Sequence, residues 1–257
     1  MGHFKLKHTA KQHMLKPRRP LCFTVTLVYL IFTTLLLQLI YNLSEIGQVQ
    51  TQLFVALSQQ ADAFARYGIM PPLALPSFSP TLFGSFFFVV PWLFIWILDL
   101  GFLFYNRALI KDENPGIRGL FEGFNYFVKG VLVRLVHSVL LIGGLILLIV
   151  PGLIVLCAFS QVNFLLLDHP EKGVIWFFAE SARLMRRRKW DYFVLQLSFL
   201  GWRVLNVVLV TTLPFLRYAI HIWFYPYSTL TFVAYYNELS GQTPPPPEGE
   251  WKRPGMY

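Results

Sequence analysis

Ionisable side chains inside apolar stretches are the residues of this chain that could do chemistry. Asp99 lies six residues before the end of one apolar stretch, and Arg134 and His137 lie three residues apart in the next. Six residues of helix place Asp99 roughly 9 Å from the stretch's end. Because charges are costly inside a bilayer, such groups mark either functional sites or buried pairs. We expect Asp99 to contact Arg134 or His137, as a proton- or ion-handling site or as a structural pair.

A second polar set spans the last two apolar stretches. Gln196, Arg203 and Asn206 follow at intervals of seven and three residues, and His221 and Tyr225 are four residues apart. These spacings place each group on one face of a helix. We expect a polar seam between the two helices. The seam could line a water-filled path, bind a lipid phosphate or act only as packing glue, at ~0.6 kcal/mol per hydrogen bond.

No known catalytic or cofactor motif accompanies these residues. The sequence contains no GxSxG, HExxH, P-loop or dinucleotide glycine fingerprint. Its 13 acidic residues include no convincing pair on one face for general acid and base catalysis. The three histidines of the first 20 residues do not have the spacing of a tetrahedral metal site. We predict a protein without enzymatic activity, cofactor or metal.

The elements that must position the polar groups are long apolar segments. The chain has 257 residues, of which 55% are hydrophobic and 14% charged, below the ~25% of soluble domains. Each segment is long enough to cross a ~30 Å hydrocarbon layer as a helix. The predicted fold is therefore an all-α, polytopic membrane bundle of residues 21–240 with six transmembrane helices. The predicted spans are Leu21–Tyr41, Leu82–Tyr105, Val131–Val150, Pro151–Leu167, Tyr192–Thr212 and Tyr218–Asn237.

The distribution of positive charge predicts which way these helices face. Of the 22 Lys and Arg residues, 18 fall before the first span, after the second, after the fourth or after the sixth. Lys and Arg are enriched in the cytoplasmic loops of membrane proteins. The protein is therefore expected in the cell (cytoplasmic) membrane, with both termini on the cytoplasmic side. The net charge of +9 is then explained by orientation and anionic lipid, and no nucleic-acid partner is implied.

Segments outside the six spans have distinct characters. Residues 1–20 are a basic cytoplasmic tail, expected to be mobile, and residues 241–257 are a proline-rich cytoplasmic tail. The external segment 42–81 contains an amphipathic helical pattern over residues 48–66. Between the third and fourth spans we expect a tight hairpin that breaks at Pro151 and Gly152. The Gly143–Gly144 pair is a second expected break or a close-packing point.

Residues 170–190 are predicted to form an amphipathic helix in the membrane interface. Ile175, Phe178, Ala182 and Met185 recur at helical spacing, which favours contact of this face with acyl chains. A cluster of basic residues follows, and it could bind anionic lipid or serve only as a topogenic signal. The lipid-binding candidates are Arg183, Arg186, Arg187, Arg188 and Lys189.

Several short stretches together carry a resemblance to a known family. They are Gly101–Arg107, Gly119–Phe124, Ile149–Gly152, Leu167–Pro170 and Ser181–Trp202. Over residues 80–240 the chain resembles an uncharacterised six-span bacterial membrane family, a domain of unknown function common in Gram-positive bacteria. That family is distantly similar to the membrane domain of glycerophosphodiester phosphodiesterases. Arg203 departs from the family's pattern, where an uncharged residue is expected. The resemblance implies an architecture and brings no catalytic or ligand residues.

These observations favour a lipid-interacting or partner-binding membrane component. Its expected partners are anionic membrane lipids, and a protein partner or a second copy of the chain. The alternative is a small transporter or channel with a polar path between the fifth and sixth helices.

Overall fold

The structure of this chain is a computed structural model that describes residues 3–15, 21–69, 72, 81–212 and 214–242. These residues form helices and turns, with no strand among them, and the predicted all-α class is confirmed. Most of the external segment after residue 69, and the proline-rich tail beyond residue 242, lie outside the described residues.

Eleven α-helices and two short 3-10 helices make up the described chain. They are α1 (His3–Met14), α2 (Leu21–Leu43), α3 (Glu45–Tyr67), α4 (Leu82–Ile110), η1 (Gly116–Leu120), η2 (Glu122–Tyr126), α5 (Phe127–Leu147), α6 (Ile149–Ala158), α7 (Val162–Asp168), α8 (Val174–Leu184), α9 (Lys189–Leu197), α10 (Leu200–Thr212) and α11 (Pro214–Ser240).

Four helical segments in the described part of the chain are long and apolar enough to cross a membrane. They are Cys22–Leu43, Leu82–Ile110, Gly116–Leu147 and Val150–Asp168. They correspond to the first four predicted spans, which is compatible with a helical membrane protein. The second segment continues five residues past its predicted end. Asp99 therefore lies eleven residues before the end of α4, about 16 Å along the helix.

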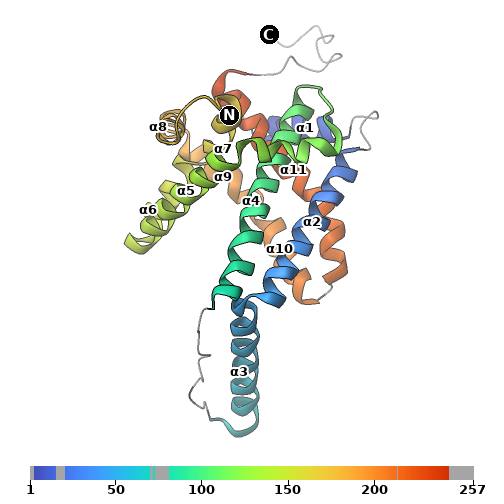
Figure 1. The fold of residues 1–257 in the computed structure, drawn as a ribbon, viewed down its shortest axis with the longest axis vertical. Helices are drawn as coiled ribbons and strands as arrows, with labels where there is room; N and C mark the ends of the chain where they lie inside the picture. Colours follow the sequence, from blue (N-terminus) through green and yellow to red (C-terminus); the bar gives the residue numbers. More distant parts are fainter. Residues whose placement is uncertain (1–2, 16–20, 70–71, 73–80, 213, 243–257) are drawn as a thin grey trace.

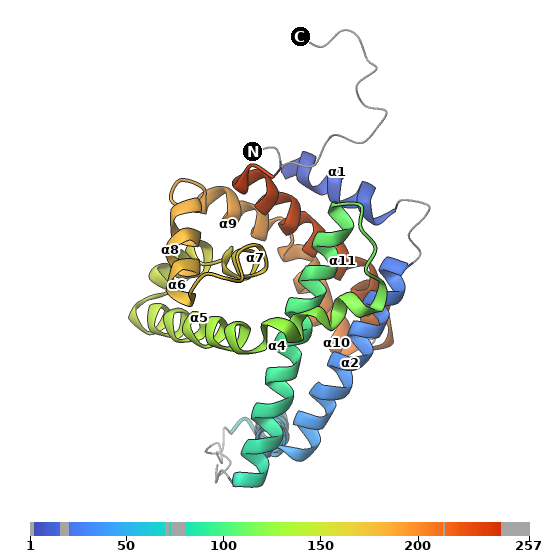
Figure 2. The same ribbon diagram turned by 45° about the horizontal axis from the view of Figure 1, so that its top comes forward.

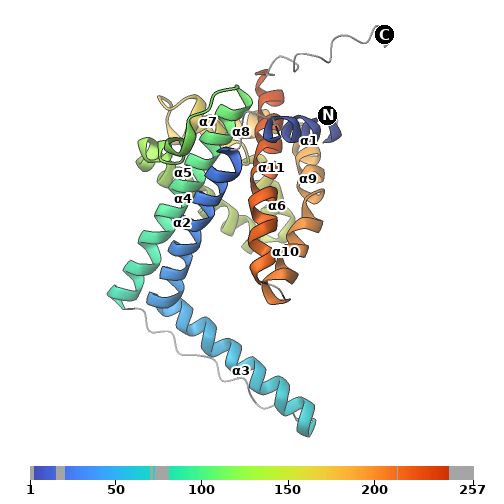
Figure 3. The ribbon, with the colours of Figure 1, turned by 90° about the vertical axis from the view of Figure 1, so that its right-hand side faces the viewer.

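The region of the fifth and sixth predicted spans is built differently. The fifth is divided at Ser198 and Phe199 into α9 and α10, while α11 is continuous over 27 residues. Figures 1 and 3 show α2 beside α4 and α10 beside α11, with all four running along the long axis of the molecule. Figure 2 shows α5, α6, α7 and α8 together on one side of α4. These helices alone do not establish six membrane crossings, or the side of the membrane on which the termini lie.

The α5–α6 hairpin is present, and its break differs from the expected one. The chain reverses at Leu148, whose backbone is extended (φ −175°, ψ 160°), so Pro151 lies in the first turn of α6. Proline is tolerated there because the first turn needs no N–H donor. The expected close-packing point is confirmed at Gly144, where an added Cβ would lie 3.1 Å from the Cα of Gly152. In the third segment, only 6% of the most apolar 18-residue stretch is buried. The helix α5 therefore leaves most of its apolar surface uncovered.

The two amphipathic helices α1 and α3 lie at opposite ends of the molecule (Figure 1). Residues 3–14, part of the expected mobile tail, instead form α1, which packs across α11 (Figure 3). Its buried side contains Leu6, Ala10 and Met14. The predicted helix over residues 48–66 is present within α3, which extends from the end of α2.

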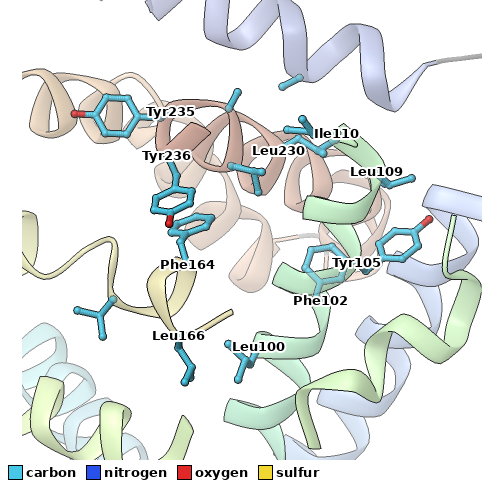
Figure 4. Packing of buried hydrophobic residues seen from close by; sticks show 14 of the residues in the cluster. Leu100, Phe102, Tyr105, Leu109, Ile110, Phe164, Leu166, Leu230, Tyr235 and Tyr236 are labelled. Carbon is cyan, nitrogen blue, oxygen red and sulfur yellow. The ribbon is translucent and has the colours of Figure 1, made fainter. Parts of the chain in front are cut away.

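The core of the molecule is rich in aromatic side chains. Figure 4 shows Phe164 of α7 facing Tyr236 of α11, and their rings stack at 4.8 Å. Phe102 and Tyr105 project from α4 into the same core and are fully buried. Bulky rings from separate helices thus join α4, α7 and α11 and fix the helices that carry the polar groups.

The expected orientation of the amphipathic segment 170–190 is wrong. Its helix, α8, buries Phe177, Phe178 and Ser181 against the protein, whereas Ile175 is 86% exposed. The Ser181 hydroxyl donates a hydrogen bond of 2.8 Å to the Ala158 carbonyl, which fixes the rotation of α8. Phe178 and Met185 of the predicted acyl-facing side are therefore buried in the protein, where α8 contacts α7 and α5.

Candidate functional site

A polar contact between the long helices joins Asp99 to Tyr29 and, through Tyr29, to Tyr225. Tyr29 of α2 donates a hydrogen bond to the Asp99 carboxylate of α4. The Tyr29 hydroxyl also lies 3.0 Å from the hydroxyl of Tyr225 on α11. Three helices that are distant in sequence thus meet at one carboxylate. Tyr29 was not among the predicted site residues, although a hydroxyl group in the middle of an apolar span indicates a polar contact.

Aromatic stacking holds this contact in place. The ring of Tyr29 stacks on Phe102 at 4.6 Å and on Tyr225 at 5.2 Å, and Phe102 lies 5.4 Å from Tyr225. Stacked or tilted rings at such distances contribute ~0.5–1.5 kcal/mol per pair beyond their burial. The three rings therefore restrict the rotamers of the hydroxyl groups next to Asp99.

Asp99 faces a cavity of about 220 Å³ between α4, α7, α9 and α11. The lining combines aromatic rings with hydroxyl and amide groups. It consists of Asp99, Phe102, Leu103, Ser160, Asn163, Phe164, Tyr192, Tyr225, Thr229 and Phe232. Of the predicted site residues, only Asp99 and Tyr225 line this cavity. The lining residues of α7 and of the turn before it were not predicted, because the fold brings them here from a distant part of the sequence.

The expected contact of Asp99 with Arg134 or His137 is not formed. The Arg134 guanidinium lies over the ring of Trp96, 5.4 Å from its centroid, and acts on Asp99 only through its charge. The His137 ring meets Phe178 of α8 edge to face at 6.4 Å. Similar depth along neighbouring helices was the basis of the prediction. The helix α5 does pack against α4, but its rotation brings Arg134 to Trp96 and His137 to Phe178 of α8.

The expected polar seam is present as two separate arms. In the first arm, Arg203 donates a 2.6 Å hydrogen bond to Gln196, and Gln196 donates a 2.8 Å bond to the Tyr192 hydroxyl. This arm runs along α10 and α9 and ends at Tyr192, in the cavity wall.

The second arm joins α10 to α11. The Asn206 amide nitrogen lies 3.1 Å from Nε2 of His221, and the His221 ring stacks on Tyr225 at 6.3 Å. Beside it, Trp202 of α10 packs on Trp223 and Phe224 of α11, at 5.6 and 5.8 Å. In the part of this interface that the structure describes, aromatic rings fill the space between α10 and α11.

A buried ion pair lies nearer the end of α4. Arg107 donates to the Asp168 carboxylate of α7, and the side chains are 6% and 11% exposed. Tyr236 donates to the second carboxylate oxygen, and the Arg107 guanidinium lies 5.6 Å from the Tyr236 ring centroid. Arg107 follows the predicted second span, and its pairing with Asp168 was not predicted because their proximity depends on the packing of α7 against α4.

The basic cluster lies where α8 turns into α9. Arg183 donates a 2.8 Å hydrogen bond to Glu180, and Arg188 lies 3.6 Å from Asp191. The Arg183 hydrogen bonds lower the pKa of Glu180. Two further arginines of the cluster, Arg186 and Arg187, are exposed and form no ion pair with the residues described.

A further cation lies on α1. The Lys7 ammonium group lies over the ring of Phe199, 4.7 Å from its centroid, and burial lowers the pKa of Lys7.

Across the described chain, no group of three or more His, Cys, Asp or Glu side chains is placed to hold a metal ion.

Comparison with known proteins gives one match. Residues 135–243 match a family described as protein of unknown function (DUF975). This domain covers the region from α5 to α11, whereas the resemblance noted for residues 80–134 lies outside it. Neither the curated proteins nor the solved structures contain a match.

Proposed function

We propose that this protein is a multi-pass membrane protein that binds anionic lipids at the basic cluster between α8 and α9. The observation that carries the proposal is the exposure of Arg186 and Arg187, which lack acidic partners among the described residues. Beside them, the apolar Trp190 is 72% exposed. Arginine binds phosphate through several N–H donors, and tryptophan favours the membrane–water interface.

The position of the cluster in the molecule supports the same function. Figure 1 shows α1, the last turns of α4 and the α8–α9 region at one end of the molecule, and α3 at the other. The first group carries most of the chain's described Lys and Arg residues, while α3 carries only Arg66. A six-span topology with both termini in the cytoplasm places the basic end against the anionic cytoplasmic leaflet. The protein acts there without catalysis, as a lipid-interacting or partner-binding component.

The alternative function, a transporter or channel with a path between α10 and α11, is less well supported. The rings of Trp202, Trp223 and Phe224 occupy that interface. The pairing of Asn206 with His221 satisfies polar groups within it. These contacts are those of helices packed through aromatic and hydrogen-bonded side chains, so the polar groups there favour packing over conduction.

The proposal is tested by native mass spectrometry of the full chain in a maltoside detergent. The protein is titrated with phosphatidylglycerol and with an uncharged galactosyl diacylglycerol. We expect retention of the anionic lipid and its loss in the triple variant Arg186→Gln, Arg187→Gln, Lys189→Gln. Each cation near an anionic surface contributes ~1 kcal/mol, so affinity should fall by up to about a hundredfold.

A matched single variant keeps this test specific. Arg66→Gln removes a positive charge from an exposed position on α3, at the opposite end of the molecule, and is compared with Arg186→Gln. Arg66→Gln should bind phosphatidylglycerol like the wild type, whereas Arg186→Gln should bind it more weakly. Equal losses in these two single variants, or equal binding of the uncharged lipid, would contradict a lipid site at the basic cluster.

A further inference from the structure

The cavity beside Asp99 combines a carboxylate with several aromatic faces, and neither feature is used in lipid binding at the basic cluster. We propose that this cavity binds a small organic ammonium cation. Asp99 supplies the counter-charge, and the rings of α4, α7, α9 and α11 form the walls.

The first argument is the charge of Asp99. In the described part of the chain no Lys, Arg or His side chain forms an ion pair with Asp99, and its hydrogen-bond partner is the neutral Tyr29. Arg134, the cation that acts on it from a distance, lies over Trp96 instead. A carboxylate among apolar helices is costly unless a cation or a proton neutralises it. A cation in the adjacent cavity would neutralise it.

The second argument is the aromatic lining. Five of the ten lining residues carry an aromatic ring, and Phe102, Phe164 and Tyr192 are buried. Ring faces attract organic cations, and aromatic cages are the usual recognition sites for quaternary ammonium groups. Inorganic cations are instead held by shells of oxygen ligands. A cavity of about 220 Å³ walled by rings therefore suits an organic cation better than a bare ion.

The amide side chain of Asn163 also lines the cavity. This amide forms no side-chain hydrogen bond within the part of the chain that the structure describes. The Thr229 hydroxyl lies in the same lining and donates to the backbone carbonyl of Tyr225, so its lone pairs remain available as acceptors, whereas the Ser160 hydroxyl already accepts a 2.7 Å hydrogen bond from Gln161. Asn163 and Thr229 would accept hydrogen bonds from a hydroxyl or N–H group of the bound cation.

Calorimetric titration of the full chain in a maltoside detergent tests the proposal with choline. Its control ligand is 3,3-dimethylbutan-1-ol, which has the same shape without the charge. We expect choline to bind the wild type at least about tenfold more tightly than the neutral alcohol. Equal affinity for the two, or no detectable binding of choline, would overturn the proposal.

Two variants locate the site. Asp99→Asn removes the charge and Phe232→Leu removes one ring face, and each should weaken choline binding by about tenfold or more. Asp62→Asn, which changes an exposed acid on α3, should leave binding unchanged. Asp99→Asn could impair folding. The Phe232→Leu variant and the comparison of the two ligands on the wild type therefore each test the proposal without it. Undiminished choline binding in both site variants would overturn the proposal.

Further ligands identify the source of the ammonium group and exclude another ion. Displacement of choline by dihexanoyl phosphatidylcholine would support the proposal with a lipid headgroup as the ligand. Binding of choline without such displacement would support it with a free cation. Displacement of choline by sodium or potassium ions at equal concentration would overturn it in favour of an inorganic cation site.

Discussion

The Arg107–Asp168 pair shows how a single residue acquires its role from the fold. Arg107 lies in the last turn of a long apolar helix, a position at which a cation is expected to reach water. Here its side chain is 6% exposed and is held by the carboxylate of α7 and the ring of Tyr236. A buried ion pair of this kind is weak evidence of net stabilisation, but breaking it leaves an uncompensated charge.

The losses from removing the two partners of this pair should therefore not add. We expect Arg107→Met or Asp168→Leu to lower the free energy of unfolding by about 3–5 kcal/mol. The double variant should lose less than the sum of the two, because no charge is left unpaired. Thermal unfolding in detergent measures all three.

Arg118→Gln is the control for this series, since Arg118 is exposed at η1. It should change stability by no more than about 0.5 kcal/mol. Additive losses in the double variant would show that Arg107 and Asp168 do not act as a pair.

At the scale of elements, glycines decide how closely the turn between α4 and α5 approaches α4. A Cβ on Gly101 would overlap the backbone carbonyl of Leu120 in η1, and one on Gly123 would overlap the carbonyl of Ile97. Backbone cannot move aside as a flexible side chain can. The 3-10 helices therefore lie directly on α4 because both surfaces lack side chains at these points.

Gly101→Ala should accordingly destabilise the protein by about 1–3 kcal/mol, the usual effect of overfilling a packed site. A helix normally gains ~1 kcal/mol from this exchange, so a loss identifies the steric conflict. Gly201→Ala in α10 is the matched control, because nothing lies within 4 Å of its added Cβ. Thermal unfolding that ranks the variants in the opposite order would contradict the close packing of η1 on α4.

For the whole molecule, charge asymmetry predicts its placement in the membrane. The basic elements gather at the end opposite α3 (Figure 1). Transfer of the basic end across a membrane is disfavoured during insertion. We therefore expect the two ends of the molecule to face different compartments.

Cysteine labelling tests this placement. Both native cysteines, Cys22 and Cys157, are buried and are not joined by a disulfide, so they can be replaced by alanine before single cysteines are introduced. An impermeant maleimide should label Lys11→Cys and Glu238→Cys from one side of membrane vesicles and Ser58→Cys only from the other. Labelling of positions 11 and 238 from opposite sides would exclude the six-span topology.

Several features followed from the sequence because they depend on neighbours along the chain. The first four apolar spans, the amphipathic helix within α3 and the hairpin near Pro151 are fixed by local composition. The Arg203–Gln196 contact follows from helical spacing alone, since the two are seven residues apart.

Only the tertiary structure decided which helices face one another. Depth along a span placed Asp99 level with His137, but the rotation and tilt of α5 turn His137 towards Phe178, while α2 brings Tyr29 to Asp99. The burial of Arg107 and the covered face of α8 were likewise set by α7. Hydropathy and spacing specify one helix at a time, whereas contacts between helices depend on the shapes of side chains distant in sequence.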